Sequence, residues 1–364
     1  MQEHVKLFIP GPIEVRESIL QAQVKPMIGH RGKPFEQLFS GIQSKLRTVF
    51  NTSSRVLVST SSGTGLWEGA ARNCITDDPS TGVLATVCGA FSERWADVFE
   101  RNGKTTSVIK VAEGKAIKPD MVRDAIKVHH GKFDAIAIVH NETSTGVMNP
   151  LTDIVQVIRE LSPGTLILVD AVSSLAGVKI DFDLLGIDVL LTSSQKCFGL
   201  PPGLAFAAVS DRALERARHI KNRGYYFDFV ELDNFLQKNN TPATPAISLL
   251  NALEQQLSDM LAEGLENRYA RHAHLAEMTR NWAISRGYAM FAEPGFESPT
   301  VTCVSNSRKT DISAMNKYLA TRHLHLSDGY GGLKGKTFRI AHMADLQESD
   351  MKELFGAIDD FLAK

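Results

Sequence analysis

The chain has 364 residues, of which 43% are hydrophobic, and a formal net charge of -1 at pH 7. A chain of this length can form two domains with real hydrophobic cores, and its balanced charge gives no electrostatic reason to expect a nucleic-acid or membrane partner. No run is apolar enough to indicate a membrane span or a secretory signal, so we expect a cytoplasmic protein. The scattered cysteines predict reduced thiols and no bound metal: Cys74, Cys88, Cys197 and Cys303.

Short apolar runs alternate with helical patterns from about residue 56 to residue 210. Runs that are apolar at successive positions are typical of strands buried on both faces of a largely parallel sheet. The runs are VLVST (56–60), VLATVC (83–88), AIAIVH (135–140), TLILVD (165–170), VLLTSS (189–194) and LAFAAVS (204–210). This alternation predicts an α/β domain with helices flanking a central sheet.

The segments outside this region complete the predicted organisation. A helical stripe that includes Leu250, Leu253 and Leu257 predicts one long connecting helix. Short strands mixed with helices after Pro294 predict a small α+β domain. The N-terminal residues are punctuated by proline and glycine, and we expect them to lie over the large domain. We therefore divide the chain into an N-terminal segment (1–30), a large domain (31–250), a connecting helix (251–290) and a small domain (291–364).

Two residues with useful chemistry follow the ends of predicted strands. Lys196 comes after VLLTSS, and Asp170 ends TLILVD. Ligands of α/β sheets bind at the carboxyl ends of the strands. A lysine among apolar and turn-forming residues can lose its proton and act as a nucleophilic amine, whereas a buried aspartate needs a partner. Taken singly, the lysine fits a solvated loop residue better, and the aspartate fits a helix cap or an ion pair.

Further candidates occupy similar positions. The segment Ser61–Gly65 opens a helical pattern, so it is either a phosphate cradle or an ordinary helix cap. Phe91 can stack on a flat ring or fill the core. The dense polar run His140–Gly146 at a strand end favours a site. Arg339, flanked by apolar residues in FRIAHM, is either a surface residue or a bidentate carboxylate clamp.

These residues gain meaning together, because they place a lysine, an aspartate and a phosphate cradle at the strand ends of one sheet. This combination describes a site for pyridoxal phosphate. The ring nitrogen of that cofactor must stay protonated to accept electrons from a substrate carbanion, and a neighbouring carboxylate keeps it so.

With these motifs the chain resembles the class V aminotransferases of fold type I, most closely the group of alanine–glyoxylate, serine–glyoxylate and serine–pyruvate aminotransferases. The matching motifs are PGP (10–12), GHRGKPF (29–35), SGTG (62–65), HNETSTGV (140–147), DAVSSLAG (170–177), SQKCFGLPPGLAF (194–206), NNTPATPAIS (239–248) and FRIAHM (338–343). The resemblance implies a fold type I pyridoxal-phosphate transferase: α/β, with a mainly parallel central sheet flanked by helices and a smaller C-terminal α+β domain.

The resemblance also implies roles for individual positions. Lys196 would form the Schiff base with the cofactor, and Asp170 would contact its ring nitrogen. Arg339 and Gly11 would bind the substrate, with Arg339 on its α-carboxylate. The other implied cofactor contacts are Ser62, Gly63, Thr64 and Gln195 at the phosphate, Thr143 at the phenolic oxygen, Val172 under the ring, and Phe91 stacked on it where the family commonly has tryptophan.

Sites in this family are shared between two subunits, so we expect a homodimer. The segment that would reach the partner's cofactor phosphate contains Asn240 and Thr241. Its form is nearer to phosphoserine aminotransferase than to the animal alanine–glyoxylate enzymes, which carry a tyrosine there. His30 and Arg31 are similar to the substrate-phosphate pair of phosphoserine aminotransferase, but glyoxylate enzymes carry similar sequences. Whether these two residues bind substrate stays open.

The expected reaction is a ping-pong transfer of an amino group from a small amino acid, serine or alanine, to a 2-oxo acid such as glyoxylate or pyruvate. Alternatives are a phosphoserine aminotransferase, a pyridoxal-phosphate lyase or cysteine desulfurase on the same fold, and a non-catalytic scaffold. A desulfurase needs a reactive cysteine on a mobile loop, whereas Cys303 lies in the apolar run TVTCV. A scaffold would not need Lys196, Asp170 and Arg339 together.

Overall fold

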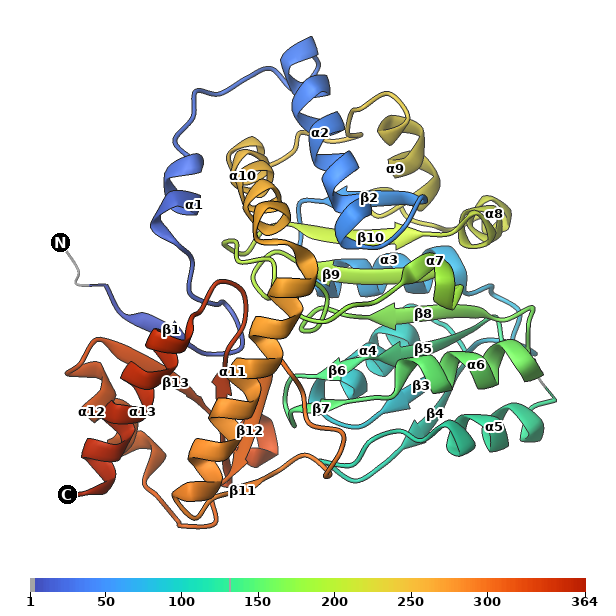
Figure 1. Cartoon of the computed structure of the whole chain (residues 1–364). Helices are drawn as coiled ribbons and strands as arrows, with labels where there is room; N and C mark the ends of the chain where they lie inside the picture. The colour runs from blue at the N-terminus through green and yellow to red at the C-terminus, as the bar shows by residue number, and fades with distance from the viewer. Residues whose placement is uncertain (1–3, 131) are drawn as a thin grey trace.

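The computed structural model describes residues 4–130 and 132–364, and two main sheets organise it (Figure 1). The larger sheet has the strand order β2-β10-β9-β8-β5-β3-β4, and the smaller sheet has the order β1-β13-β14-β12-β11. The strands of the larger sheet are β2 (Arg55–Ser59), β3 (Val83–Val87), β4 (Thr106–Lys110), β5 (Ala135–Val139), β8 (Leu166–Asp170), β9 (Val189–Ser193) and β10 (Ala205–Val209). The strands of the smaller sheet are β1 (Lys6–Phe8), β11 (Ala289–Met290), β12 (Val301–Ser305), β13 (Leu324–Asp328) and β14 (Thr337–Ala341).

The apolar runs predicted as strands between residues 56 and 210 are confirmed as strands of the larger sheet, and TVTCV and FRIAHM as strands of the smaller sheet. The neighbours β9, β8, β5, β3 and β4 pair in parallel, whereas β10 pairs antiparallel with both β2 and β9. The expected mainly parallel sheet is therefore confirmed. A separate short hairpin, β6 (Asn141–Glu142) with β7 (Val147–Met148), continues the chain after β5.

The larger sheet is buried on both faces because helices cover each of them. Side chains alternate across a strand, so Ile136 and Ile138 of β5 join one core while Ala135 and Ala137 join the other. In Figure 1, α5 and α6 lie in front of the sheet and α3 and α4 lie behind it. The helices of this part are α2 (Lys33–Val49), α3 (Gly63–Cys74), α4 (Ala90–Arg101), α5 (Pro119–Val128), α6 (Leu151–Leu161), α7 (Phe182–Leu185), α8 (Asp211–His219) and α9 (Phe229–Leu236).

The connection between the two sheets differs from the single long helix expected over residues 251–290. It consists of two helices, α10 (Ile247–Glu263) and α11 (Leu265–Ser285), which are separated at Gly264. The φ of Gly264 is 84°, a left-handed conformation that interrupts an α-helix and that glycine adopts at low cost. Helix α10 packs on α2 of the larger part, whereas α11 packs on β12 of the smaller sheet.

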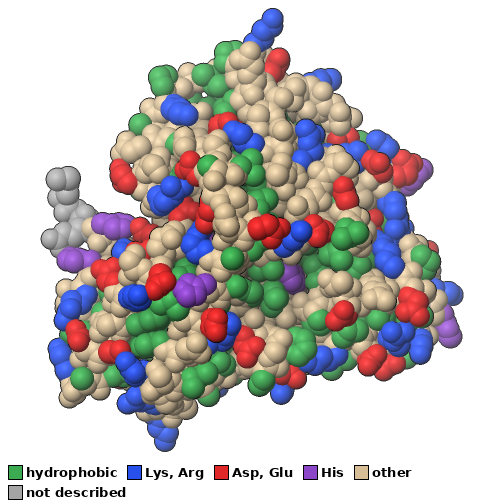
Figure 2. Space-filling model, in the orientation of Figure 1, with side chains coloured by type: hydrophobic (Ala, Val, Ile, Leu, Met, Phe, Trp, Pro, Cys, Tyr) green, Lys and Arg blue, Asp and Glu red, His purple; other side chains and the backbone are tan. Residues whose placement is uncertain are grey.

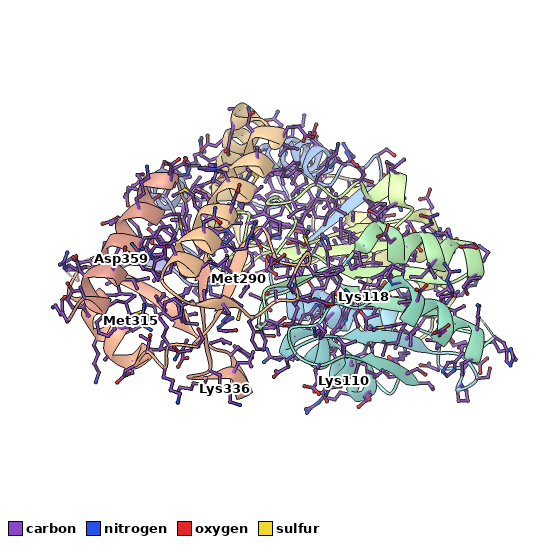
Figure 3. The ribbon with its side chains drawn as sticks, turned by 60° about the horizontal axis from the view of Figure 1, so that its bottom comes forward. Lys110, Lys118, Met290, Met315, Lys336 and Asp359 are labelled. Atoms are coloured by element: carbon purple, nitrogen blue, oxygen red, sulfur yellow. The ribbon has the colours of Figure 1, made fainter. Side chains whose placement is uncertain are left out.

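The N-terminal segment was expected to lie over the large domain, but it also contributes to the smaller sheet. Its strand β1 pairs in parallel with β13, and helix α1 (Glu17–Ala22) contacts α10. The smaller sheet packs against α11, α12 (Ile312–Ala320) and α13 (Glu348–Leu362) around a separate apolar core. Figure 3 shows this separation, because Met315 and Asp359 lie on the side of α12 and α13 while Lys110 and Lys118 lie on the side of the larger sheet.

Acidic and basic side chains are interspersed over the face shown in Figure 2, as the balanced net charge suggests. Within residues 4–130 and 132–364, no helix combines the length and the apolar character that crossing a bilayer requires.

Candidate active site

A cavity of about 240 Å³ lies at the carboxyl ends of the parallel strands of the larger sheet. Most of the residues predicted for the site line it: Gly11, Ser62, Gly63, Thr64, Phe91, Thr143, Asp170, Val172, Gln195 and Lys196. Asn141, from the polar run that the sequence predicted as part of a site, also lines it. Its other lining residues were given no role: Trp67, Arg94, Ser173 and Ser193. Asp170 and Ser193 are the last residues of β8 and β9, and other lining residues lie in the segments that follow the strands, the place where ligands bind α/β sheets.

Lys196 follows β9, and its amine lies against the N-terminal segment. Its Nζ donates a hydrogen bond to the carbonyl of Pro10. A Cβ atom added to Gly11 would lie 2.6 Å from the same Nζ, and the φ of Gly11 is 142°, so this position requires glycine. Burial and, to a lesser extent, the positive charge of Arg339 together lower the pKa of Lys196 to about 8. The amine is therefore easier to deprotonate than an ordinary lysine, as a nucleophile requires.

Asp170 lies at the end of β8, and two donors hold its carboxylate. The backbone N–H of Val172 donates to Oδ1 at 2.7 Å, and the indole N–H of Trp67 donates to Oδ2 at 3.0 Å. Burial raises the pKa of Asp170 to about 7, and the two hydrogen bonds oppose this rise. Trp67 was missed in the sequence, although it lies one helical turn after Gly63, on the same side of α3.

Several polar groups around the cavity lack partners within the described part of the chain. Asn141 Oδ1, Ser193 Oγ and Gln195 Oε1 are buried and accept or donate no hydrogen bond there. Helix α3 begins at Gly63 without a side-chain cap from Ser62, so its first N–H groups are available to an anion. The Ser193 hydroxyl and the helix N–H groups can donate to an anionic ligand, and the two amide oxygens can accept from a donor group on a ligand. An amine, a carboxylate and an uncapped helix end in one cavity therefore fit pyridoxal phosphate.

Comparison with known proteins identifies the family. The model of the family described as Aminotransferase class-V matches residues 16–336. The chain belongs to the class V aminotransferases. The serine–glyoxylate aminotransferase of Methylorubrum extorquens is 32% identical to it, covering 97% of this chain and 89% of that protein. The L-aspartate–glyoxylate aminotransferase of Paracoccus denitrificans is 31% identical to this chain, and the match covers 94% of this chain and 87% of that protein.

The structural comparison agrees with the family. The crystal structure of the alanine–glyoxylate aminotransferase from Nostoc sp. superimposes with a TM-score of 0.92 at 30% identity, covering 100% of this chain and 96% of that one. The fold type I architecture and the dependence on pyridoxal phosphate that the sequence predicted are thereby confirmed. The chain is therefore a transaminase that depends on pyridoxal phosphate.

Phe91 is held in place by a buried acid. The backbone N–H groups of Phe91 and Ser92, at the start of α4, donate to the carboxylate of Glu142 at 3.2 and 2.9 Å. The ring of Phe91 in turn contacts that of Tyr330, with 4.9 Å between their centroids. Tyr330 belongs to the loop that precedes β14. Phe91, which lines the cavity, is therefore packed against an aromatic ring from the part that contains the smaller sheet.

Arg339 lies in β14, only 6% exposed, and has no carboxylate partner among the described residues. Its guanidinium donates only to carbonyl oxygens, those of Asp328 and Thr143, each at 3.3 Å. The guanidinium of Arg339 therefore lies next to Thr143, a residue that lines the cavity. A buried cation without an anion is costly, and a substrate carboxylate would compensate it.

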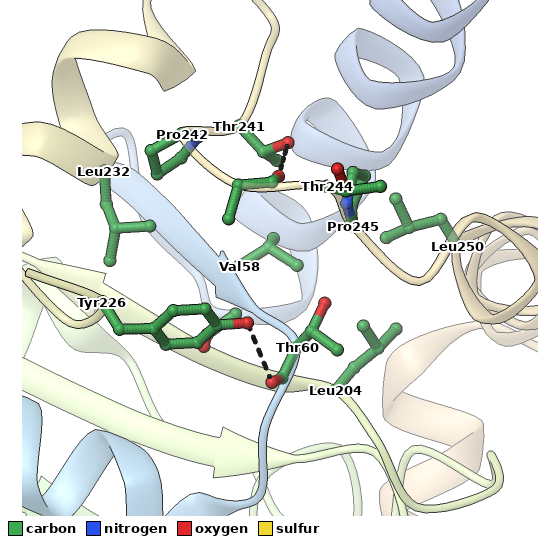
Figure 4. Close-up of a pocket in the computed structure, with 12 residues that line it drawn as sticks. Val58, Thr60, Leu204, Tyr226, Leu232, Thr241, Pro242, Thr244, Pro245 and Leu250 are labelled. Carbon is green, nitrogen blue, oxygen red and sulfur yellow. Dashed lines mark hydrogen bonds between the residues drawn. The ribbon is translucent and has the colours of Figure 1, made fainter. Parts of the chain in front are cut away.

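Asn240 and Thr241 do not line the cavity that contains Lys196. Their loop joins α9 to α10, and Thr241 lines a separate cavity of about 30 Å³ near Val58 and Tyr226 (Figure 4). Arg31 donates to the side chain of Asn240 and to the backbone carbonyls of Thr241 and Pro242. Within the described chain, the guanidinium of Arg31 thus holds this loop.

Cys303 gives no support to the desulfurase alternative. It lies in β12, only 2% exposed, and burial raises the pKa of its thiol to about 12. A thiol in this environment stays protonated at neutral pH and is a poor nucleophile. The other three cysteines are also free and buried.

Proposed function

We propose that this aminotransferase moves the amino group of a small amino acid, serine or alanine, to a 2-oxo acid such as glyoxylate or pyruvate. The observation that carries the proposal is the shared cavity in which the amine of Lys196 and the hydrogen-bonded carboxylate of Asp170 both lie. Glyoxylate recurs in the names of the relatives with serine, aspartate and alanine as donors, which supports glyoxylate as the acceptor.

The roles of the site residues form part of this proposal. Pyridoxal phosphate supplies an electron sink for the carbanion that forms at the substrate's α-carbon. Lys196 would hold the cofactor covalently and would accept the substrate's α-proton at Nζ. Asp170 keeps a proton on the ring nitrogen. Arg339 and the backbone at Gly11 bind the substrate carboxylate. The remaining cofactor contacts are Ser62, Gly63, Thr64 and Gln195 at the phosphate, Thr143 at the phenolic oxygen, and Val172 and Phe91 on the two ring faces.

We further propose a homodimer, a cytoplasmic location and a division into domains. The free, buried cysteines suit a reducing compartment. The loop held by Arg31 lies outside its own subunit's cavity, which suits a role in the partner's site. The two sheets support the large domain over 31–250 and the small domain over 291–364 as separate units.

A screen of half-reactions tests the function. The purified holoenzyme is mixed with single amino acids, and the loss of cofactor absorbance is followed without any acceptor. We expect conversion by serine and alanine, followed by recovery of the absorbance when glyoxylate or pyruvate is added. Faster conversion by phosphoserine than by serine would select the phosphoserine alternative, and no conversion by any amino acid would contradict amino transfer.

Changing Arg339 to lysine is expected to lower kcat/KM for donor and acceptor alike. Lysine keeps the charge but lacks the fork of parallel N–H donors that matches a carboxylate. Losing one partner of a desolvated charge pair costs about 2–5 kcal/mol, which corresponds to a fall of roughly thirtyfold or more. Steady-state kinetics with both substrates measure this, and the cofactor spectrum should stay normal.

The control for this variant is Arg286→Lys, because Arg286 does not line the cavity and its guanidinium bonds only to Asp359 and the Ser285 hydroxyl among the described residues. Surface ion pairs contribute about 0–1 kcal/mol. Equal kcat/KM values of Arg339→Lys and Arg286→Lys, for donor and acceptor, would contradict a carboxylate clamp at Arg339.

A hybrid dimer made from two different inactive variants is expected to regain activity that each variant alone has lost. One parent carries Lys196→Ala, and the other carries Asn240→Ala with Thr241→Ala. In the hybrid, the subunit with an intact Lys196 faces a partner with an intact loop, so one complete site forms. Co-expression with two different affinity tags isolates this hybrid for assay. Activity of a monomer, shown by light scattering at the assay concentration, would refute the shared site.

A further inference from the structure

A second guanidinium borders the cavity, that of Arg94 near the start of α4. Its Nη2 donates to the hydroxyl of Tyr330 at 2.6 Å. Its Cζ lies 5.4 Å from the ring centroid of Phe91 and 5.9 Å from that of Tyr330. These contacts leave most of its N–H groups without an acceptor.

Arg94 has no acidic partner in the part of the chain that the structure describes. The adjacent Glu93 pairs instead with Lys110 at 2.6 Å, and Arg101 on the same helix pairs with Asp97 at 2.8 Å. Arg94 is thus an exposed basic residue of α4 that lines the cavity and forms no ion pair with a described residue. An unpaired guanidinium can still bind a carboxylate through two parallel N–H groups.

Tyr330 separates Arg94 from Arg339. The Cζ of Arg339 lies 5.5 Å from the Tyr330 ring centroid, and the Tyr330 hydroxyl accepts from Arg94. One guanidinium is therefore buried beneath this aromatic ring and the other lies at its hydroxyl end. Two cations at different positions around one cavity can hold two anionic groups of one small molecule.

We propose that Arg94 binds an acidic group on the side chain of the substrate, so that the enzyme also uses a dicarboxylic amino acid as donor. The inference rests on the proposed function, with Arg339 holding the α-carboxylate. The donor becomes the corresponding 2-oxo diacid while the acceptor becomes an amino acid, so the reaction needs no further reactant. Arg94 is then a specificity-determining residue.

The first test compares aspartate with asparagine, which has the same shape but a neutral amide. We expect kcat/KM of the half-reaction to be higher for aspartate by about tenfold or more, as for a hydrogen-bonded charge pair. Arg94→Gln should abolish this preference and lower the rate with aspartate far more than the rate with alanine. Arg101→Gln, on the same helix, should keep the preference.

The second test is an equilibrium measurement on the holoenzyme that needs no turnover. Succinate and butyrate differ in one carboxylate, and their binding is followed through the cofactor spectrum. Succinate should bind more tightly than butyrate to the wild type, and Arg94→Gln should remove the difference. If neither preference exists, or if Arg94→Gln lowers the rates with all donors equally, Arg94 only braces Tyr330 and the proposal is overturned while amino transfer stands. If no amino acid reacts, the proposed function fails, but the succinate preference still tests Arg94.

Discussion

Replacing Lys196 with alanine is expected to abolish amino transfer while leaving a folded protein. Alanine cannot hold the cofactor covalently and cannot accept the α-proton at Nζ, so two roles are lost together. The side chain lies at the cavity and contacts the backbone of Pro10, and it forms no salt bridge within the described residues. Its removal therefore leaves the core intact. The variant should show no measurable turnover and should not retain cofactor after borohydride reduction.

The matched control for this variant is Lys179→Ala, which removes an exposed lysine whose ion pairs are with Asp181 and Glu266. It should keep full activity. In the wild type, covalent capture of added cofactor should accelerate as the pH rises through about 8, the pKa of Lys196, because only the neutral amine attacks. Mass spectrometry after borohydride treatment locates the modified residue, and finding the cofactor on a different lysine would refute the assignment.

The strands that the sequence predicted in the larger sheet are buried on both faces, and β4, the strand of that sheet that it missed, is not. Every residue of β5 and β8 is buried, so each forms a continuous apolar run. By contrast, β4 is an edge strand that pairs only with β3, and its residues are mostly exposed or half-buried. Such a strand needs no apolar run, and its sequence TSVIK resembles a loop.

The break at Gly264 was missed for a different reason. Apolar residues continue at helical spacing on both sides of it, because α10 and α11 each bury one face. Periodicity reports that a face is buried, not that the helix axis continues. The glycine itself was the available signal, since it commonly ends a helix in a left-handed conformation.

The site residues that the sequence predicted best lie at the ends of strands. Two of the site residues that it missed lie inside the helices that follow the strands. Lys196 and Asp170 stand directly after apolar runs, which makes them visible. Trp67 and Arg94 reach the cavity only because α3 and α4 turn one face toward it. That orientation comes from packing between helix and sheet, which a single sequence does not specify.

Changing Asp170 to asparagine is expected to lower kcat by about a hundredfold or more, a barrier increase of roughly 2.7 kcal/mol at about 1.4 kcal/mol per decade. Asparagine is neutral and cannot keep the ring nitrogen protonated, so the electron sink weakens. The amide also disturbs the local hydrogen bonds. Asp170 accepts from the Val172 N–H and the Trp67 indole with its two oxygens, whereas an amide offers one oxygen and one NH₂ group. One of these buried donors then loses its acceptor, at a cost of about 1–3 kcal/mol in stability.

Trp67→Phe separates the loss of the carboxylate from the loss of a hydrogen bond. It removes the indole donor to Oδ2 but keeps the carboxylate and its bond to the Val172 N–H. Because the Trp67 hydrogen bond lowers the pKa of Asp170, its loss should raise that pKa and cause a milder fall in kcat. Measured at saturating cofactor, with thermal unfolding of each variant as a check on folding, kcat should therefore decrease from wild type to Trp67→Phe to Asp170→Asn. A kcat of Asp170→Asn near the wild-type value would show that this carboxylate does not control the ring nitrogen, because the charge is the property that only this variant removes.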